Sequence, residues 1–194
     1  TQEQLARASF PVGALRKSEV RAQARRLGLN VAEKPDSQEI CFVPGRYTDF
    51  VKKHSPDRLP GRGNIVSADG RVLGEHEGAH YFTVGQRKRL LLPEPSPYFV
   101  TEIRPETNEV VVGVESDLFV GEMLVRRVNW QGTPKLGRVM VKIRSRHEKT
   151  EAEILKIDDE GVRVRFVAPQ KAVTPGQAAV FYEADGVLGG GWIH

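Results

Sequence analysis

The sequence predicts a mainly β protein: a short α-helical N-terminal segment, a small central β domain, then an antiparallel β-barrel. Two observations support this fold class. Nineteen glycines and twelve prolines among 194 residues indicate many turns between short elements. From about residue 60 the apolar residues change from helical spacing to alternation, which is typical of strands. We therefore expect three parts, residues 1–54, 55–114 and 115–194.

The N-terminal part is expected to be helical over residues 1–30. Ser18 is a candidate N-cap, and Gly28 a natural C-terminal stop, for one amphipathic helix. The arginines of this helix lack interleaved aromatic residues, so we interpret them as a solvated helix face. The stretch PGRYTDFVKKH, residues 44–54, predicts one more short helix.

The central part has the alternation of strands. NIVSADGRVLG, residues 64–74, predicts a β-hairpin, because Asp69-Gly70 supplies the positive φ angles of a tight turn. HYFTVGQRKR, residues 80–89, is also predicted to be a strand. YFVTEIRPETNEVVVG predicts two further strands that turn near Asn108.

The C-terminal part contains six short runs separated by turn sequences such as DDEG and TPGQ, a pattern that favours a small antiparallel barrel. The runs are EMLVRRVNW, RVMVKIRSRH, EAEILKI, GVRVRFV, AAVFY and GVLGGGWI. In the second run, alternation places Val139, Val141 and Ile143 on one face and Met140, Lys142, Arg144 and Arg146 on the other. From these residues alone, the cationic face is either a phosphate-binding row or an ordinary solvated surface.

Composition and charge limit the class of protein. No apolar run approaches the roughly 20 residues of a membrane-spanning helix, and we expect no membrane partner. TQEQLARASF lacks the charged start and long apolar body of a signal peptide. A single cysteine cannot form an internal disulfide, so a cytoplasmic location is expected. The net charge of +4 permits a polyanionic partner without requiring one.

Two segments match known motifs in their letters but lack the surrounding secondary structure that those motifs require. HEGAH, residues 76–80, has the letters of a zinc-protease motif, which requires a helix to bring both imidazoles together. Gly74 and Gly78 disfavour a helix there, and histidines four residues apart on a strand are about 13 Å apart, too far to share one zinc. LGGGWI lacks the lysine and the following helix of a phosphate-binding loop, and is expected to be a bend in the last strand.

The only cysteine, Cys41, lies in KPDSQEICFVP, residues 34–44. Free cysteine is among the most frequently buried residue types. The local sequence therefore favours a small core side chain.

Five segments, taken in chain order, resemble the bacterial tRNA-specific 2-thiouridylases: FPVGALRKSEVR, KPDSQEICFVP, LGEHEGAHYFTVGQRK, VNW and AVTPGQAAVFYEADGVLGGGWI. The resemblance covers essentially the whole chain. It implies an enzyme that replaces the C2 oxygen of the wobble uridine of certain tRNAs with sulfur. It also implies ATP, bound by an N-terminal ATP-pyrophosphatase domain whose Ser-Gly-Gly-x-Asp-Ser-type loop is absent here.

We therefore expect the chain to be the C-terminal portion of such an enzyme, inactive by itself and without a metal. Residues 1–54 would be the helical tail of the catalytic domain, including the cysteine loop. In this family, the cysteine that matches Cys41 carries a persulfide, and a second cysteine in the N-terminal domain releases the sulfur by forming a disulfide. The implied partners are tRNA and a sulfur-donor protein, either a cysteine desulfurase or a sulfur-relay protein.

The resemblance also implies tRNA-binding residues. Arg144, Ser145 and Gln177 match family contact positions, and the neighbouring cations join them as candidates: Lys142, Arg146, Arg87 and Lys88. The family commonly has an aromatic residue where this chain has Ser145, so a stacking contact is expected to be missing. A second departure is Arg89, where the family usually has glycine after GQRK.

Two other functions stay open. The chain could be a non-catalytic tRNA-binding β module in which Cys41 is structural, or a protein-interaction barrel like those of translation factors. Loss of thiolation on replacing Cys41 separates the enzyme from the binding module. Salt-sensitive tRNA binding separates both of these from the protein-interaction barrel.

Overall fold

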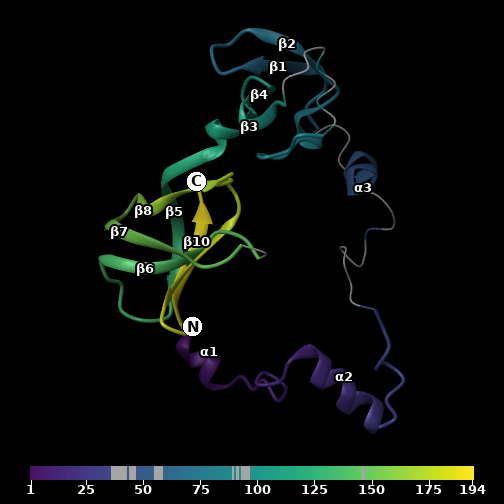
Figure 1. Ribbon diagram of the computed structural model, residues 1–194, viewed down its shortest axis with the longest axis vertical. Coiled ribbons are helices and arrows are strands. Elements are labelled where there is room, and N and C mark those ends of the chain that lie inside the picture. Colours follow the sequence, from purple (N-terminus) through teal and green to yellow (C-terminus); the bar gives the residue numbers. More distant parts are fainter. Residues whose placement is uncertain are drawn as a thin grey trace. The chain divides into compact units, whose positions relative to one another are not determined.

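The computed structural model describes residues 1–35, 43, 47–54, 59–88, 90, 92, 97–145 and 147–194. The chain divides into two compact units, Thr1–His54 and Ser55–His194. Figure 1 labels the helices of the first unit and the strands of the second. Within the described ranges, no helix is both long and apolar enough to cross a membrane.

In its described residues, the first unit contains three helices: α1 (Gln2–Ala6), α2 (Lys17–Arg26) and α3 (Tyr47–His54). Helices α2 and α3 confirm the two predicted helices. The expectation of helix over residues 1–30 is wrong in extent, because residues 7–16 and 27–30 lie outside α1 and α2. The N-cap of α2 is Arg16, so the predicted Ser18 cap is also wrong. The backbone N–H of Arg16 donates to a Glu19 carboxylate oxygen at 2.6 Å, so a first-turn carboxylate closes the helix start. Gly28, in the left-handed region at φ 66°, follows the helix end as predicted.

Part of the second unit is a mixed sheet, described with the strand order β2-β1-β4-β3. Its strands are β1 (Gly63–Ser67), β2 (Val72–His76), β3 (Phe99–Arg104) and β4 (Glu109–Gly113). The antiparallel β1–β2 hairpin turns at Gly70 (φ 86°), and β3–β4 turns at Asn108 (φ 53°), which confirms both turn positions. The predicted positive φ at Asp69 is wrong, because only Gly70 of this pair is in the left-handed region. The parallel β1–β4 pair joins the two hairpins into one sheet.

The strand predicted over residues 80–89 is wrong. Ala79–Tyr81 form a 3₁₀ helix, and the chain then turns through Gly85 in the left-handed region at φ 88°. The N–H of Gly85 donates to the carbonyl oxygen of Val100 at 2.7 Å, so the segment lies beside β3 without continuing as a strand. Its apolar residues cover the sheet, because Phe82 packs against the buried core.

All six strands predicted in the C-terminal part are confirmed. They close into a barrel in the order β10-β5-β8-β7-β6-β9, and each neighbouring pair is antiparallel. The strands are β5 (Phe119–Trp130), β6 (Gly137–Lys142), β7 (Thr150–Asp158), β8 (Gly161–Lys171), β9 (Ala178–Glu183) and β10 (Gly186–Ile193). Closure pairs both sides of every strand, which removes the exposed edges of an open sheet.

The barrel interior follows the alternation of its strands. Val139, Val141 and Ile143 are buried, which confirms the inward face predicted for this segment. Phe181 on β9 is fully buried, and its ring stacks on Trp130 with centroids 5.8 Å apart. The outward positions of the same strands are therefore the ones that can meet a partner.

Candidate functional site

The cysteine segment has no described geometry. Cys41 lies outside the described residues, and so does Arg146, the last cation of the predicted row. Val43, two residues beyond the thiol, is described and is buried. The role of Cys41 therefore depends on its sequence context.

The barrel has a hollow of about 610 Å³ on its outer surface, formed by segments far apart in the sequence. The end of β6 contributes Lys142, Arg144 and Ser145, and the loop before β9 contributes Gln177. These are four of the predicted tRNA-binding residues. The fold brings them together because β6 and β9 pair side by side, with Lys142 opposite Val180.

Two aromatic side chains complete this hollow, which we call the barrel groove. Trp192 on β10 is 53% exposed. Tyr182 on β9 is half-buried and has the Nζ atom of Lys149 4.2 Å from its ring centroid, a cation–π contact. Neither residue was among the predicted tRNA-binding residues, because LGGGWI was interpreted only as a bend in the last strand and AAVFY only as a barrel strand. Strand alternation in AAVFY, which places Tyr182 opposite to the buried Phe181, is the signal for the tyrosine.

Arg144 is fixed by the barrel backbone. Its Nη2 atom donates to the carbonyl oxygens of Lys171 at 2.6 Å and Ala172 at 3.0 Å. A guanidinium has five N–H donors, so Nε and Nη1 are left for other acceptors. The prediction that Lys142, Arg144 and Arg146 form a row along one strand is wrong in extent, because β6 ends at Lys142.

Arg87 and Lys88 lie elsewhere. Both are exposed in the loop between the 3₁₀ helix and β3, and neither lines the barrel groove. The positive charge of Arg87 contributes to lowering the pKa of Glu115, after the larger effect of the Lys171 ammonium that bonds to this carboxylate. The seven predicted tRNA contacts therefore do not form one cluster in the described residues.

HEGAH does not form the α-helix that the zinc-protease motif requires, as predicted, although its last two residues belong to the 3₁₀ helix. They run from the end of β2 through a bend into the 3₁₀ helix, so no α-helical turn aligns the two histidines. His76 is buried, and its Nε2 lies 3.2 Å from the carbonyl oxygen of Asn108. Burial lowers the pKa of His76, which favours the neutral imidazole. Among the described residues, no group of three or more His, Cys, Asp or Glu side chains is placed to hold a metal ion.

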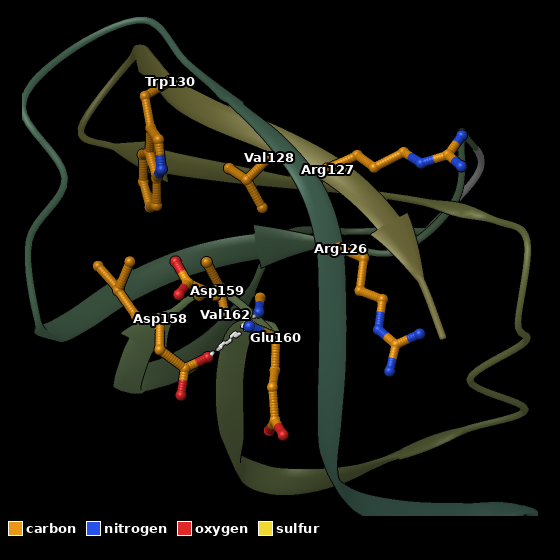
Figure 2. Close-up of a pocket in the computed structure, with 10 residues that line it drawn as sticks. Arg126, Arg127, Val128, Trp130, Asp158, Asp159, Glu160 and Val162 are labelled. Atoms are coloured by element: carbon orange, nitrogen blue, oxygen red, sulfur yellow. Dashed lines mark hydrogen bonds between the residues drawn. The ribbon is translucent and has the colours of Figure 1, made fainter.

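A second hollow of the barrel, of about 470 Å³, has a different character. Its lining combines Arg126 and Arg127 with an acidic loop, Asp158–Glu160. Figure 2 shows both arginine side chains extending away from Asp158, whose carboxylate accepts the backbone N–H of Glu160 at 3.0 Å. Carboxylates repel phosphates, so this hollow is less suited to a nucleic acid than the barrel groove.

Three family models match consecutive parts of the chain. The tRNA methyl transferase HUP domain matches residues 1–45, and the tRNA methyl transferase PRC-barrel domain matches residues 48–114. The aminomethyltransferase beta-barrel domain matches residues 120–193, which include the described barrel groove.

Curated relatives match over the full chain. The protein named tRNA-specific 2-thiouridylase MnmA from Lachnoclostridium phytofermentans is 46% identical over 198 residues, covering 100% of this chain and 55% of its own length. Proteins of the same name from Koribacter versatilis and Solibacter usitatus are 47% and 48% identical, covering 100% of this chain and 54% and 55% of their own lengths. The chain spans about half the length of the curated relatives it matches.

Proposed function

Because the chain belongs to the bacterial tRNA-specific 2-thiouridylase family, we propose that it is the C-terminal portion of an ATP-dependent sulfurtransferase acting on the wobble uridine of tRNA. The observation that carries this proposal is the match over the whole chain, which includes the KPDSQEICFVP segment. The barrel groove supports the tRNA-binding half of the proposal, since it gathers cationic and amide side chains on one surface.

In this proposal, ATP makes the C2 oxygen of the uridine a good leaving group by adenylation. Gly189, Gly190 and Gly191 lie within β10, so this glycine run is part of a strand. In this proposal ATP is bound by the N-terminal ATP-pyrophosphatase domain that the family resemblance implies. In this proposal, this chain contributes the cysteine that carries the sulfur and residues that bind tRNA.

Cys41 would supply the sulfur as a persulfide loaded by a donor protein. The terminal sulfur attacks C2 of the activated uridine, a C–S bond forms, and the C2–O bond breaks as adenylate leaves. The S–S bond of the persulfide must then break. A second cysteine attacks the sulfur of Cys41, so that the transferred atom stays on the base and the two cysteines end as a disulfide.

The barrel groove would hold tRNA through two kinds of contact. Lys142 and the remaining donors of Arg144 suit phosphate oxygens, and the Gln177 amide suits a base edge or a ribose hydroxyl. The backbone bonds of Arg144 pre-position its guanidinium, which reduces the entropy lost on binding.

Replacing the thiol tests the proposal. In the enzyme that includes the ATP-binding domain, Cys41→Ser should abolish formation of 2-thiouridine, measured by mass spectrometry of digested tRNA, and leave tRNA affinity within about twofold. Val31→Ala, which shortens an exposed side chain of the same unit, is the matched control and should retain thiolation. Retained thiolation in Cys41→Ser would contradict the sulfur-carrier role and favour the tRNA-binding module with a structural cysteine.

A further inference from the structure

The barrel groove has a regular arrangement across its strands. On β9, Ala178, Val180 and Tyr182 share the outward face. Trp192 pairs with Ala178 from β10, and Lys142 pairs with Val180 from β6. Along the strand direction, the order is therefore an aromatic residue, a cation and a second aromatic residue. Along the strand direction, the positions of Trp192 and Tyr182 are offset by four residues, or about 13 Å at roughly 3.3 Å per residue.

The two aromatic side chains serve different purposes. The Trp192 indole is exposed, although the residue next to it, Ile193, is buried in the barrel core. A nucleic-acid base can stack on an exposed indole that has cations beside it, since every base has a π-face. The Tyr182 ring instead has the Lys149 ammonium above it at 4.2 Å, which places a cation at the far end of the row.

The charges around this row favour a polyanion. Lys142 and Arg144 line the barrel groove, and Arg126 pairs with Trp192 from the other side, on β5. No acidic side chain is among the described residues that line the barrel groove. The second hollow of the barrel differs in this respect, because its loop contains Asp158, Asp159 and Glu160.

We propose that the barrel groove binds a short unpaired segment of the tRNA, with one base stacked on Trp192 and the adjoining phosphates on Lys142 and Lys149. Duplex RNA keeps its bases stacked inside the helix and is recognised by shape, 2′-hydroxyls and phosphates. Its bases therefore cannot stack on an exposed indole. Unpaired bases are held by the combination found here, an aromatic surface with cations beside it. The inference rests on the proposed function and adds the class of RNA element. The inference also gives Trp192 the stacking role of the aromatic residue that the family commonly has at the position of Ser145.

Tryptophan fluorescence tests this, because the chain contains two tryptophans. In a Trp130→Phe background, Trp192 is the only reporter. A short oligouridylate should quench its fluorescence, whereas a hairpin duplex with the same number of phosphates should bind more weakly and quench little. Equal quenching by both RNAs would overturn the proposal. This measurement leaves Trp192 in place, so it stands even where a Trp192 variant fails to fold.

Variants give a second, independent readout. Trp192→Leu should weaken oligouridylate binding about five- to 150-fold, because stacking on an aromatic contributes about 1–3 kcal/mol per base. Trp192→Phe should retain most of the affinity. Lys142→Ala should lower the slope of log affinity against log salt by about one. Arg163→Ala, which removes an exposed cation of β8 outside the barrel groove, is the matched control and should leave the quenching unchanged.

The outcome separates this inference from the proposed function. Full-length enzyme that loses tRNA affinity in Gln177→Ala but is unaffected by Trp192→Leu would overturn the stacking proposal and leave tRNA binding by the barrel intact. Enzyme in which Cys41→Ser still thiolates tRNA would contradict the sulfur-carrier role, while Trp192 quenching selective for unpaired RNA would still support the stacking proposal.

Discussion

The barrel and the Thr1–His54 unit bury very different amounts of apolar surface. Val125, Val141 and Phe181 of the barrel are fully buried, whereas Phe10 and Leu27 of the first unit are 73% and 66% exposed. Helices α1 and α2 have no buried residue. Isolated short helices are marginal in water, so α1 and α2 gain little stability from apolar burial among the described residues. The comparison indicates that the barrel has an extensive core of its own, whereas the described residues of the first unit bury little apolar surface.

Removing a core ring gives the largest expected effect. Phe181→Ala should destabilise the barrel by about 3–5 kcal/mol, because it leaves a cavity and removes the stacking partner of Trp130. Leu27→Ala in α2 should leave barrel stability within about 0.5 kcal/mol, since this side chain is mostly exposed. Urea unfolding followed by tryptophan fluorescence measures both, as both tryptophans lie in the barrel. A comparable loss in Leu27→Ala would break the comparison.

Replacing one glycine in each unit tests the same comparison of the barrel with the Thr1–His54 unit. Gly161 has φ 135°, and an added Cβ would lie 2.5 Å from the carbonyl oxygen of Val125, so Gly161→Ala should cost the barrel about 2–3 kcal/mol. Gly28 has φ 66° with nothing within 4 Å of such a Cβ, so Gly28→Ala should cost only about 1 kcal/mol, confined to α2.

The stability of the barrel should fall in Gly161→Ala and stay unchanged in Gly28→Ala. Urea unfolding followed by fluorescence measures Gly161→Ala, and amide hydrogen exchange in α2 measures Gly28→Ala. If Gly161→Ala unfolded at the same urea concentration as the unaltered chain, the close approach at the β7–β8 turn would be contradicted.

The strands could be predicted because apolar alternation and turn residues depend on neighbouring positions in the sequence. Alternation in RVMVKIRSRH gives the buried face of β6, and Asp69-Gly70 gives the β1–β2 turn. The error over residues 80–89 has a local cause too: Phe82 has strand-like spacing, but the left-handed Gly85 ends the extension. Similarly, the helix start at Arg16 depends on the Glu19 carboxylate.

The candidate site could be predicted only in part. Gln177 came from the family resemblance, and Arg144 from strand alternation supported by that resemblance; their proximity comes from the pairing of β6 with β9. The pairing of Trp192 with Ala178 depends on which strands become neighbours and in what register, which one sequence does not specify. The bonds from Arg144 to the Lys171 and Ala172 carbonyls likewise join residues about 27 positions apart.

The smallest predicted effect is a pH dependence of the Ser55–His194 unit. His76 is buried, and its pKa lies below the ordinary value because burial disfavours the imidazolium. Its Nδ1 has no hydrogen-bond partner among the described residues, so a proton there would be buried without an acceptor. In the unfolded chain the same ring takes up a proton near pH 6.5. Stability should therefore be complete above about pH 6.5, fall as the pH drops below it, and level off below the lowered pKa of the folded state.

The slope of that fall should not exceed about 1.4 kcal/mol per pH unit for one proton. Urea unfolding at a series of pH values, followed by circular dichroism, measures it. His76→Gln should remove this component, while His54→Gln, at an exposed position in the first unit, should retain it. The Arg25–Glu33 ion pair of the first unit lowers the pKa of Glu33, but both groups are exposed and solvent screens their attraction. A pH dependence that persists in His76→Gln and disappears in Glu33→Gln would place the titrating group in the first unit and reverse the comparison.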